Sequence, residues 1–219
     1  PNAYISIRVS PDGKRLAFDT DDGQEAAIWI YELSGTSQPR RLTLEGRNRF
    51  PVWSANGRRV LFQSDRDGVL GLYWQGADSG AAERLTTPEL GIAHVPESWS
   101  PTEDRFSFSV VRGTSASLWT YSVRDKQASR FGNDQSTAPF NSEFSPDGRW
   151  VAYAAAQTGV PGSQVYVRSY PGLNGPWRIS TDGGVHPRWS PDGRDLYYLN
   201  QDSTVLMVAA ITTDGTSIS

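Results

Sequence analysis

Few side chains in this sequence of 219 residues could do chemistry, and none of them forms a known catalytic motif. Cysteine is absent, which excludes disulfides, thiolate metal ligands and cysteine nucleophiles. The two histidines, His94 and His186, are far apart in the chain. Neither the G-x-S-x-G pattern of serine hydrolases nor the H-E-x-x-H pattern of zinc peptidases is present. We therefore predict no catalytic residue, no metal site and no cofactor.

The composition narrows the classes of protein further. Hydrophobic residues make up 37% and aromatic residues 11% of the chain, which is enough to build a packed core. The formal net charge is −3 and the basic residues are scattered singly, which argues against nucleic-acid binding. No run of 18 or more apolar residues occurs, so no membrane insertion is expected.

The sequence contains an internal repeat, and its structure must determine where the charged side chains lie. Five segments align without gaps on a Ser-Pro-Asp-Gly pattern or a variant of it, and they begin at Ser10, Ser54, Ser100, Ser145 and Ser190. An apolar run containing Trp or Tyr follows four of these serines, and a short RLT-like segment follows each run. Repeats of about 40 to 45 residues that hold four strands are typical of β-propeller blades.

The repeated tetrapeptide predicts a tight turn between the first two strands of each unit. Proline fixes φ at the first central position, aspartate can bond to nearby backbone, and glycine accepts a positive φ. The third unit carries Glu103 where the other four have glycine, so it is the weakest copy.

We predict an all-β fold, a β-propeller of four-stranded antiparallel blades with five blades in this chain, as a single domain over residues 1–219. The expected blades cover residues 4–43, 50–86, 96–131, 140–180 and 186–219, with Ile218 in the outer strand of the last. Two forms stay open, a closed ring of five blades and a fragment of a ring with six or more. A fragment would expose two apolar blade faces and would be expected to dimerise.

Charged residues precede three of the repeat serines by two or four positions. Strand alternation would point Arg8, Glu143, Arg188 and His186 into the channel of a propeller. In a closed ring Arg8 would flank Arg188, with Glu143 beside Arg188. The excess positive charge could hold a carboxylate, a phosphate or an acidic peptide end. The alternative is a hydrated Arg–Glu pair with a structural role.

The connecting loops add Arg49 and His94 to this predicted ligand-binding mouth. Five aspartates fall in the connections between second and third strands: Asp19, Asp21, Asp22, Asp65 and Asp67. Their spacing lacks the twelve-residue pattern and distal glutamate of an EF-hand, which favours tight turns over calcium sites.

The pattern WSPDG, followed by IW-x-Y or VYV and then RLT, resembles the TolB-like class of β-propeller repeats in all five units. The segments Leu72–Thr87 and Val165–Gly184 are most similar to propellers attached to bacterial receptor-like serine/threonine kinases. No HRD, DFG or glycine-rich kinase motif is present. The resemblance implies a bacterial repeat protein in the periplasm or beyond.

The predicted function is a non-enzymatic binding or scaffold module whose loop face and channel mouth meet a protein, a peptide or a small anion. The alternative is a channel-site enzyme acting on carbohydrate, of glycosidase or lyase type. Glu143 is the single carboxylate expected to point inward from a first strand, and a glycosidase needs two. The binding function is therefore favoured.

Overall fold

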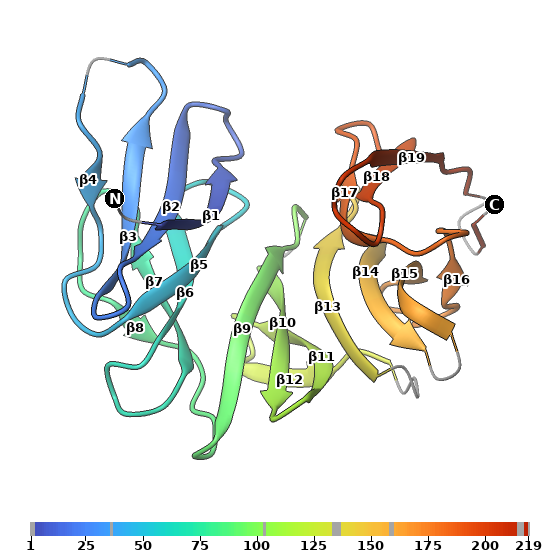
Figure 1. Cartoon of the computed structure of the whole chain (residues 1–219). Helices are drawn as coiled ribbons and strands as arrows, with labels where there is room; N and C mark the ends of the chain where they lie inside the picture. Colours follow the sequence, from blue (N-terminus) through green and yellow to red (C-terminus); the bar gives the residue numbers. More distant parts are fainter. Residues whose placement is uncertain are drawn as a thin grey trace. The chain divides into compact units, whose positions relative to one another are not determined.

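The computed structural model describes residues 3–35, 37–102, 104–132, 137–157, 160–213 and 217–218. These residues form strands and turns without a helix, and the strands make five antiparallel sheets in which each strand pairs with the next in the chain (Figure 1). The predicted all-β fold, a β-propeller with five blades in this chain, is confirmed. Glu103, which makes the third unit the weakest copy of the repeat, lies outside the described residues.

The blades follow the repeat units along the sequence, and each is named here by its strands. Blade 1 consists of β1 (Ala3–Val9), β2 (Arg15–Asp21), β3 (Ala26–Glu32) and β4 (Arg40–Arg41). Blade 2 consists of β5 (Asn48–Trp53), β6 (Arg59–Ser64), β7 (Gly71–Gly76) and β8 (Glu83–Arg84). Blade 3 consists of β9 (Ile92–Trp99), β10 (Arg105–Arg112), β11 (Ser115–Ser122) and β12 (Gln127–Arg130).

The last two blades complete the chain. They are blade 4 with β13 (Thr137–Phe144), β14 (Trp150–Gln157), β15 (Val160–Ser169) and β16 (Trp177–Arg178), and blade 5 with β17 (Val185–Trp189), β18 (Asp195–Leu199) and β19 (Leu206–Ala210). Beyond β19, the buried Ile218 forms an antiparallel bridge with Thr213.

The chain divides into two compact units. Unit 1 comprises Pro1–Pro96 and Val110–Gly113, and unit 2 comprises Glu97–Ser109 and Thr114–Ser219. Unit 1 therefore contains blades 1 and 2, and unit 2 contains blades 4 and 5.

The serine turns have the predicted geometry. Gly13 has φ +69° in the first unit, and Gly193 has φ +72° in the last. The Ser10 hydroxyl donates to Asp12 Oδ1 at 2.6 Å and accepts from the Arg15 amide at 2.9 Å. The hydroxyls of Ser54, Ser145 and Ser190 are bonded in the same way, so these serines are turn formers. The exception is Ser100 in the third unit, whose buried hydroxyl has no hydrogen-bond partner among the described residues.

Neighbouring blades pack face to face through apolar side chains. In unit 1, Ala17, Ile28 and Ile30 of blade 1 pack with Val60, Phe62 and Tyr73 of blade 2, and all are at most 2% exposed. In unit 2, blade 4 packs in the same way on blade 5, where Leu196 and Tyr198 are buried. This packing between blades forms the core, because one four-stranded sheet cannot bury both of its faces.

A tryptophan hydrogen bond recurs in these interfaces. The indole of Trp53 donates to the carbonyl of Arg8 at 3.0 Å, and the indole of Trp189 donates to the carbonyl of Glu143 at 3.2 Å. In both cases the tryptophan directly precedes the repeat serine of one blade, and the carbonyl lies two residues before the serine of the preceding blade.

The first strands carry a bulge that the sequence analysis did not anticipate. The register shifts between Arg49 and Val52 in blade 2 and between Val185 and Arg188 in blade 5. Phe50 and His186, inside these bulges, have φ values of +58° and +53°. Simple alternation therefore fails four residues before the serine, because a bulge redirects the side chain and leaves an amide outside the ladder.

Candidate functional site

Two arginines converge on one aspartate at an end of unit 1. Asp21 ends β2, whereas Arg47 and Arg49 lie around the start of β5. The Arg47 Nη2 donates to Asp21 Oδ1 at 3.1 Å and to Oδ2 at 3.3 Å, and Arg49 Nη2 donates to Oδ2. The Asp21 side chain is 9% exposed, against 37% and 30% for the two arginines. We call these three residues the arginine pair site.

The three side chains of the arginine pair site sum to one positive charge, and the carboxylates of Asp22 and Asp65 lie close to them. The Gly23 amide donates to Asp21 at 2.8 Å and lowers the pKa of this carboxyl, and Arg49 lowers it further, so Asp21 is ionised. Among the described residues, Asp21 is the one side-chain partner of either guanidinium, and the buried Nε atoms of both arginines have no hydrogen-bond partner. Each guanidinium has five N–H donors, and because Nε is buried, a ligand can reach only those on the Nη atoms.

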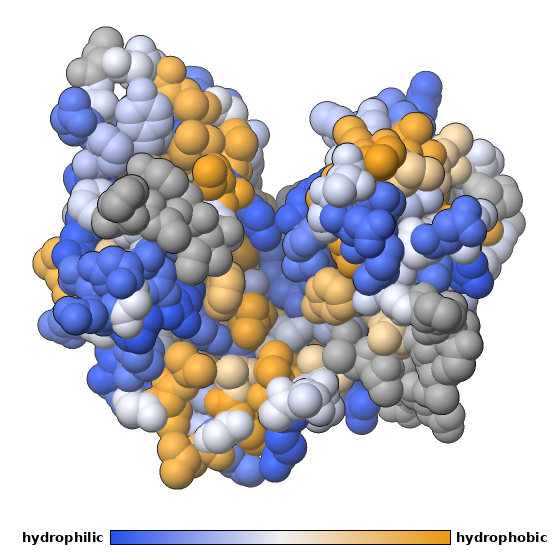
Figure 2. All heavy atoms as spheres, in the orientation of Figure 1, coloured by the Kyte–Doolittle hydropathy of each residue, from blue (hydrophilic) through white to orange (hydrophobic). Residues whose placement is uncertain are grey.

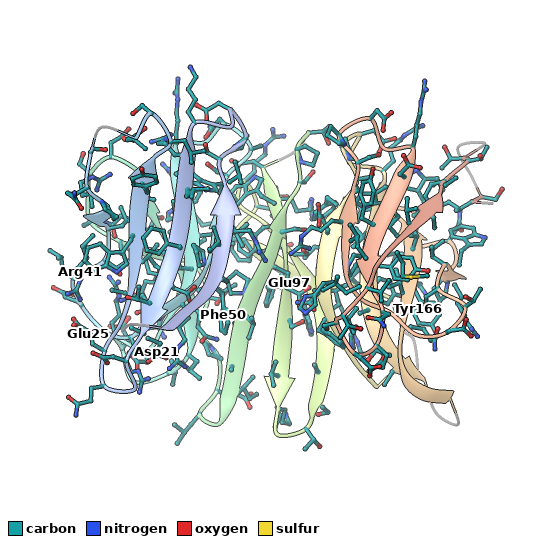
Figure 3. The ribbon with its side chains drawn as sticks, turned by 45° about the horizontal axis from the view of Figure 1, so that its top comes forward. Asp21, Glu25, Arg41, Phe50, Glu97 and Tyr166 are labelled. Carbon is teal, nitrogen blue, oxygen red and sulfur yellow. The ribbon has the colours of Figure 1, made fainter. Side chains whose placement is uncertain are left out.

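A buried carboxylate holds the strand that carries Arg49. Asp19 is fully buried, and it accepts hydrogen bonds from the Ser6 amide at 2.7 Å and from the Phe50 amide at 3.2 Å. The expectation that Asp19 and Asp21 lie in a connecting loop is wrong, because both belong to β2. Its two acceptor atoms satisfy amides from the first strands of blades 1 and 2. Figure 3 shows Asp21 and Phe50 at the same end of this unit.

In the neighbouring loops, arginines also donate hydrogen bonds to aspartates. The Arg47 amide donates to Asp65 at 2.7 Å, and the Arg84 side chain donates to Asp67 at 3.1 Å. Burial, and then the hydrogen bond to Asp67, raises the pKa of Tyr73 to about 12. These aspartates are therefore engaged in turns and ion pairs, in agreement with the expectation of tight turns.

His94 lies half-buried on β9. Its Nδ1 lies 2.8 Å from Thr86 Oγ1, which itself accepts from the Leu72 amide at 3.0 Å. Thr86 Oγ1 is therefore hydrogen-bonded both to the Leu72 amide and to the His94 ring. Burial lowers the pKa of His94 from 6.5 to about 4.

His94 makes stability depend on pH. The unfolded chain takes up a proton near pH 6.5 and the folded chain only near pH 4, so stability falls as the pH drops through this window. Between about pH 7 and pH 5 the wild type should lose about 1–2 kcal/mol more than His94→Gln does, after allowance for partial exposure. Urea unfolding at both pH values measures this difference. Equal losses of unfolding free energy in the wild type and in His94→Gln would contradict the lowered pKa of His94.

The structure brings two more of the predicted site residues together in unit 2. Glu143 Oε2 lies 2.8 Å from Arg188 Nη1, and the side chains are 25% and 40% exposed. His186 is exposed in the bulge of β17, two residues from Arg188. Arg8 lies half-buried on β1 in unit 1, where its carbonyl accepts from Trp53. Arg49 and Glu143 are thus each part of an ion pair.

Glu97, on β9, is a half-buried acid that the sequence did not single out (Figure 3). It accepts from the Ser109 hydroxyl and, at 2.6 Å, from the Ser142 amide. Burial raises its pKa above the ordinary value, and the hydrogen bonds from Ser109 and Ser142 oppose this shift. Like Asp19, it binds an amide on the first strand of the following blade, which indicates a structural role.

No group of three or more His, Asp or Glu side chains suited to a metal ion occurs in the described part of the chain. Within those same ranges, no helix has the length and apolarity needed to cross a membrane.

Two proteins of similar sequence are known, one matched over a small part of its length and the other over about two thirds of its length. The chain is 30% identical over 126 residues to the uncharacterised peptidase YuxL of Bacillus subtilis, but it covers only 19% of that protein. It is 27% identical over 202 residues to an uncharacterised protein of Agrobacterium fabrum, of which it covers 68%. No model of a known protein family matches the chain.

Solved structures place the fold among TolB-like β-propellers. A TolB-like protein from Agrobacterium tumefaciens matches with a TM-score of 0.79 and 19% identity, over 100% of this chain and 80% of that one. TolB from Acinetobacter baumannii matches with a TM-score of 0.76 and 22% identity, over 98% and 53%. An oligogalacturonate lyase in complex with manganese matches with a TM-score of 0.68 and 14% identity, over 98% and 68%. At these identities the likeness establishes the fold alone.

Proposed function

We propose that this chain is a non-enzymatic binding module that holds a carboxylate of a protein or peptide partner at the arginine pair site. The observation that carries the proposal is that Arg47 and Arg49 share the single carboxylate of Asp21. One positive charge is left over, on guanidinium groups that are about one-third exposed.

Guanidinium chemistry favours this kind of ligand. A planar guanidinium can bind a carboxylate through two parallel N–H donors, and such charge-assisted bonds are stronger than neutral ones. Asp21 orients both arginines without neutralising them, and the Asp19 bond to Phe50 fixes the strand beside Arg49. The site is thus largely formed before the ligand arrives, which lowers the entropy cost of binding.

The test begins with a library of short peptides that end in a free carboxylate, titrated by calorimetry. Arg49→Ala should weaken binding of the selected peptides about 10- to 100-fold, because it removes charge-assisted hydrogen bonds. Amidation of the peptide terminus should weaken binding to a similar degree.

A matched control removes an arginine elsewhere. Arg194 is 84% exposed and lies 3.8 Å from Asp192, so Arg194→Ala changes the net charge equally without touching the site. Its affinity for the peptides should stay unchanged. Equal binding of amidated and free peptides, or an unaltered affinity in Arg49→Ala, would refute the carboxylate site.

We further propose that the module is joined to a partner domain in a longer protein, outside the cytoplasm. The similarity of the segments Leu72–Thr87 and Val165–Gly184 to kinase-linked propellers favours this arrangement. The peptidase relative, of which the chain covers 19%, favours the same arrangement with a different partner domain. Glu143 and Arg188 then serve as a structural ion pair within unit 2.

A further inference from the structure

The sequence contains two Asn-Gly dipeptides, Asn56–Gly57 in blade 2 and Asn174–Gly175 in blade 4. An asparagine followed by glycine is prone to spontaneous deamidation, because glycine has no Cβ to keep its amide nitrogen away from the asparagine side chain. The two dipeptides are identical in sequence. A difference in their reactivity must therefore come from the fold.

Deamidation is a reaction of the main chain with the neighbouring side chain. The glycine amide loses its proton to solvent base, and its nitrogen attacks the asparagine Cγ. The new N–Cγ bond replaces the bond from Cγ to Nδ2, and ammonia leaves with a proton taken from solvent. Water then opens the cyclic imide at either carbonyl, which gives aspartate or isoaspartate. The reaction therefore needs a glycine amide that solvent can reach and an asparagine side chain that can turn.

The serine turn of blade 2 holds both reacting groups of Asn56–Gly57. The Gly57 amide donates to the Ser54 carbonyl at 2.8 Å. Asn56 Oδ1 accepts from the Ser54 hydroxyl and from the Arg58 amide, both at 3.0 Å. Gly57 is buried, and its carbonyl accepts from Arg15 Nη2 at 2.7 Å. Asn56 can therefore react only after this turn opens.

Asn174 lies in a more accessible setting, in the loop between β15 and β16. The visible surface of blades 4 and 5 carries hydrophilic and hydrophobic side chains side by side (Figure 2). In this loop, residues 171–176 are all exposed. The main chain of Asn174 is anchored, because its amide donates to Ser169 Oγ at 2.7 Å and its carbonyl accepts from the Ser169 amide at 3.0 Å.

The two groups that would react at this position are not bonded. Within the described ranges, neither the side-chain amide of Asn174 nor the main-chain amide of Gly175 has a hydrogen-bond partner. Both residues are exposed. Solvent base can therefore reach the Gly175 amide without any opening of the fold.

We propose that Asn174 is a site of spontaneous deamidation in the folded protein, whereas Asn56 is protected by its turn. The loop that carries Asn174 belongs to unit 2 and the arginine pair site belongs to unit 1. This inference is therefore independent of the carboxylate site.

The modification changes the connection to the outer strand of blade 4. A neutral amide becomes a carboxylate, and the isoaspartate form adds one carbon atom to the main chain. Trp177, the first residue of β16, packs edge-on against Trp150 with ring centroids 5.7 Å apart. The longer main chain enters β16 next to this contact, so the change marks the age of the molecule at the edge of blade 4.

Tryptic peptides report the two sites separately. Residues 50–58 contain Asn56 and residues 169–178 contain Asn174, and neither peptide holds another asparagine or a glutamine. The folded protein is incubated at mildly alkaline pH, and mass spectrometry follows the mass gain of each peptide over time. Asn174 should deamidate about 10- to 100-fold faster than Asn56, because opening the turn costs several hydrogen bonds.

The matched control is the same chain unfolded in guanidinium chloride. Neither the turn nor the loop is formed there, so the two peptides should gain mass at similar rates. Equal rates in the folded protein, or a faster rate at Asn56, would overturn the proposal. So would a ratio of rates that persists in the unfolded chain, or an Asn174 peptide that gains mass only after unfolding.

Discussion

Phe62→Ala is expected to lower the free energy of unfolding by about 3–5 kcal/mol, because it opens a cavity where two blades pack. Phe62 is 0% exposed and belongs to the cluster that joins blades 1 and 2. Urea unfolding followed by tryptophan fluorescence measures the change.

Phe18 offers a control of the same residue type at the same position of the repeat. It lies on the face of blade 1 that is turned away from blade 2, and it is only partly buried. Phe18→Ala, measured at low protein concentration, should therefore cost at least about 1.5 kcal/mol less than Phe62→Ala. Equal losses would show that stability does not depend on packing between blades.

Asp19→Ala should cost about 2–5 kcal/mol, because it leaves the amides of Ser6 and Phe50 without their acceptor inside the protein. The change should also weaken peptide binding at Arg49, because the bulge beside this residue loses its support. Urea unfolding and calorimetric titration report the two effects separately.

Asp22 provides the comparison for Asp19. It is exposed and accepts from the amides of Gln24 and Glu25 within its own turn. Asp22→Ala should change stability by less than about 1 kcal/mol. A loss as large as that of Asp19→Ala would mean that the burial of Asp19 is not the cause of its effect.

The repeat made most of the fold predictable. Ser10, Gly13 and their counterparts form local turns, and local turn chemistry can be inferred from a few adjacent residues. The positions of the apolar strands could be predicted as well, because their spacing from each serine recurs. The bulges at Phe50 and His186 were missed, because a bulge adds one residue without changing the residue types that flank it.

The site was harder to predict than the fold. Asp21 and Arg49 belong to different blades, and their contact depends on how two sheets pack rather than on any local pattern. The contact that Asp19 makes between blades could have been predicted, because polar residues recur at its repeat position. Gln63 and Ser109 occupy this position on the second strands of blades 2 and 3. Both are buried and donate to backbone carbonyls of the following blade, at 2.7 Å and 3.2 Å. A polar position repeated inside an apolar strand indicates a contact between blades.

The most direct measurement is a crystal structure of the chain with the tightest-binding carboxylate-ended peptide. The account predicts the terminal carboxylate within hydrogen-bond distance of the Arg47 and Arg49 guanidinium groups, with Asp21 still bound to both. A peptide terminus bound at another surface, with only solvent at these arginines, would contradict it.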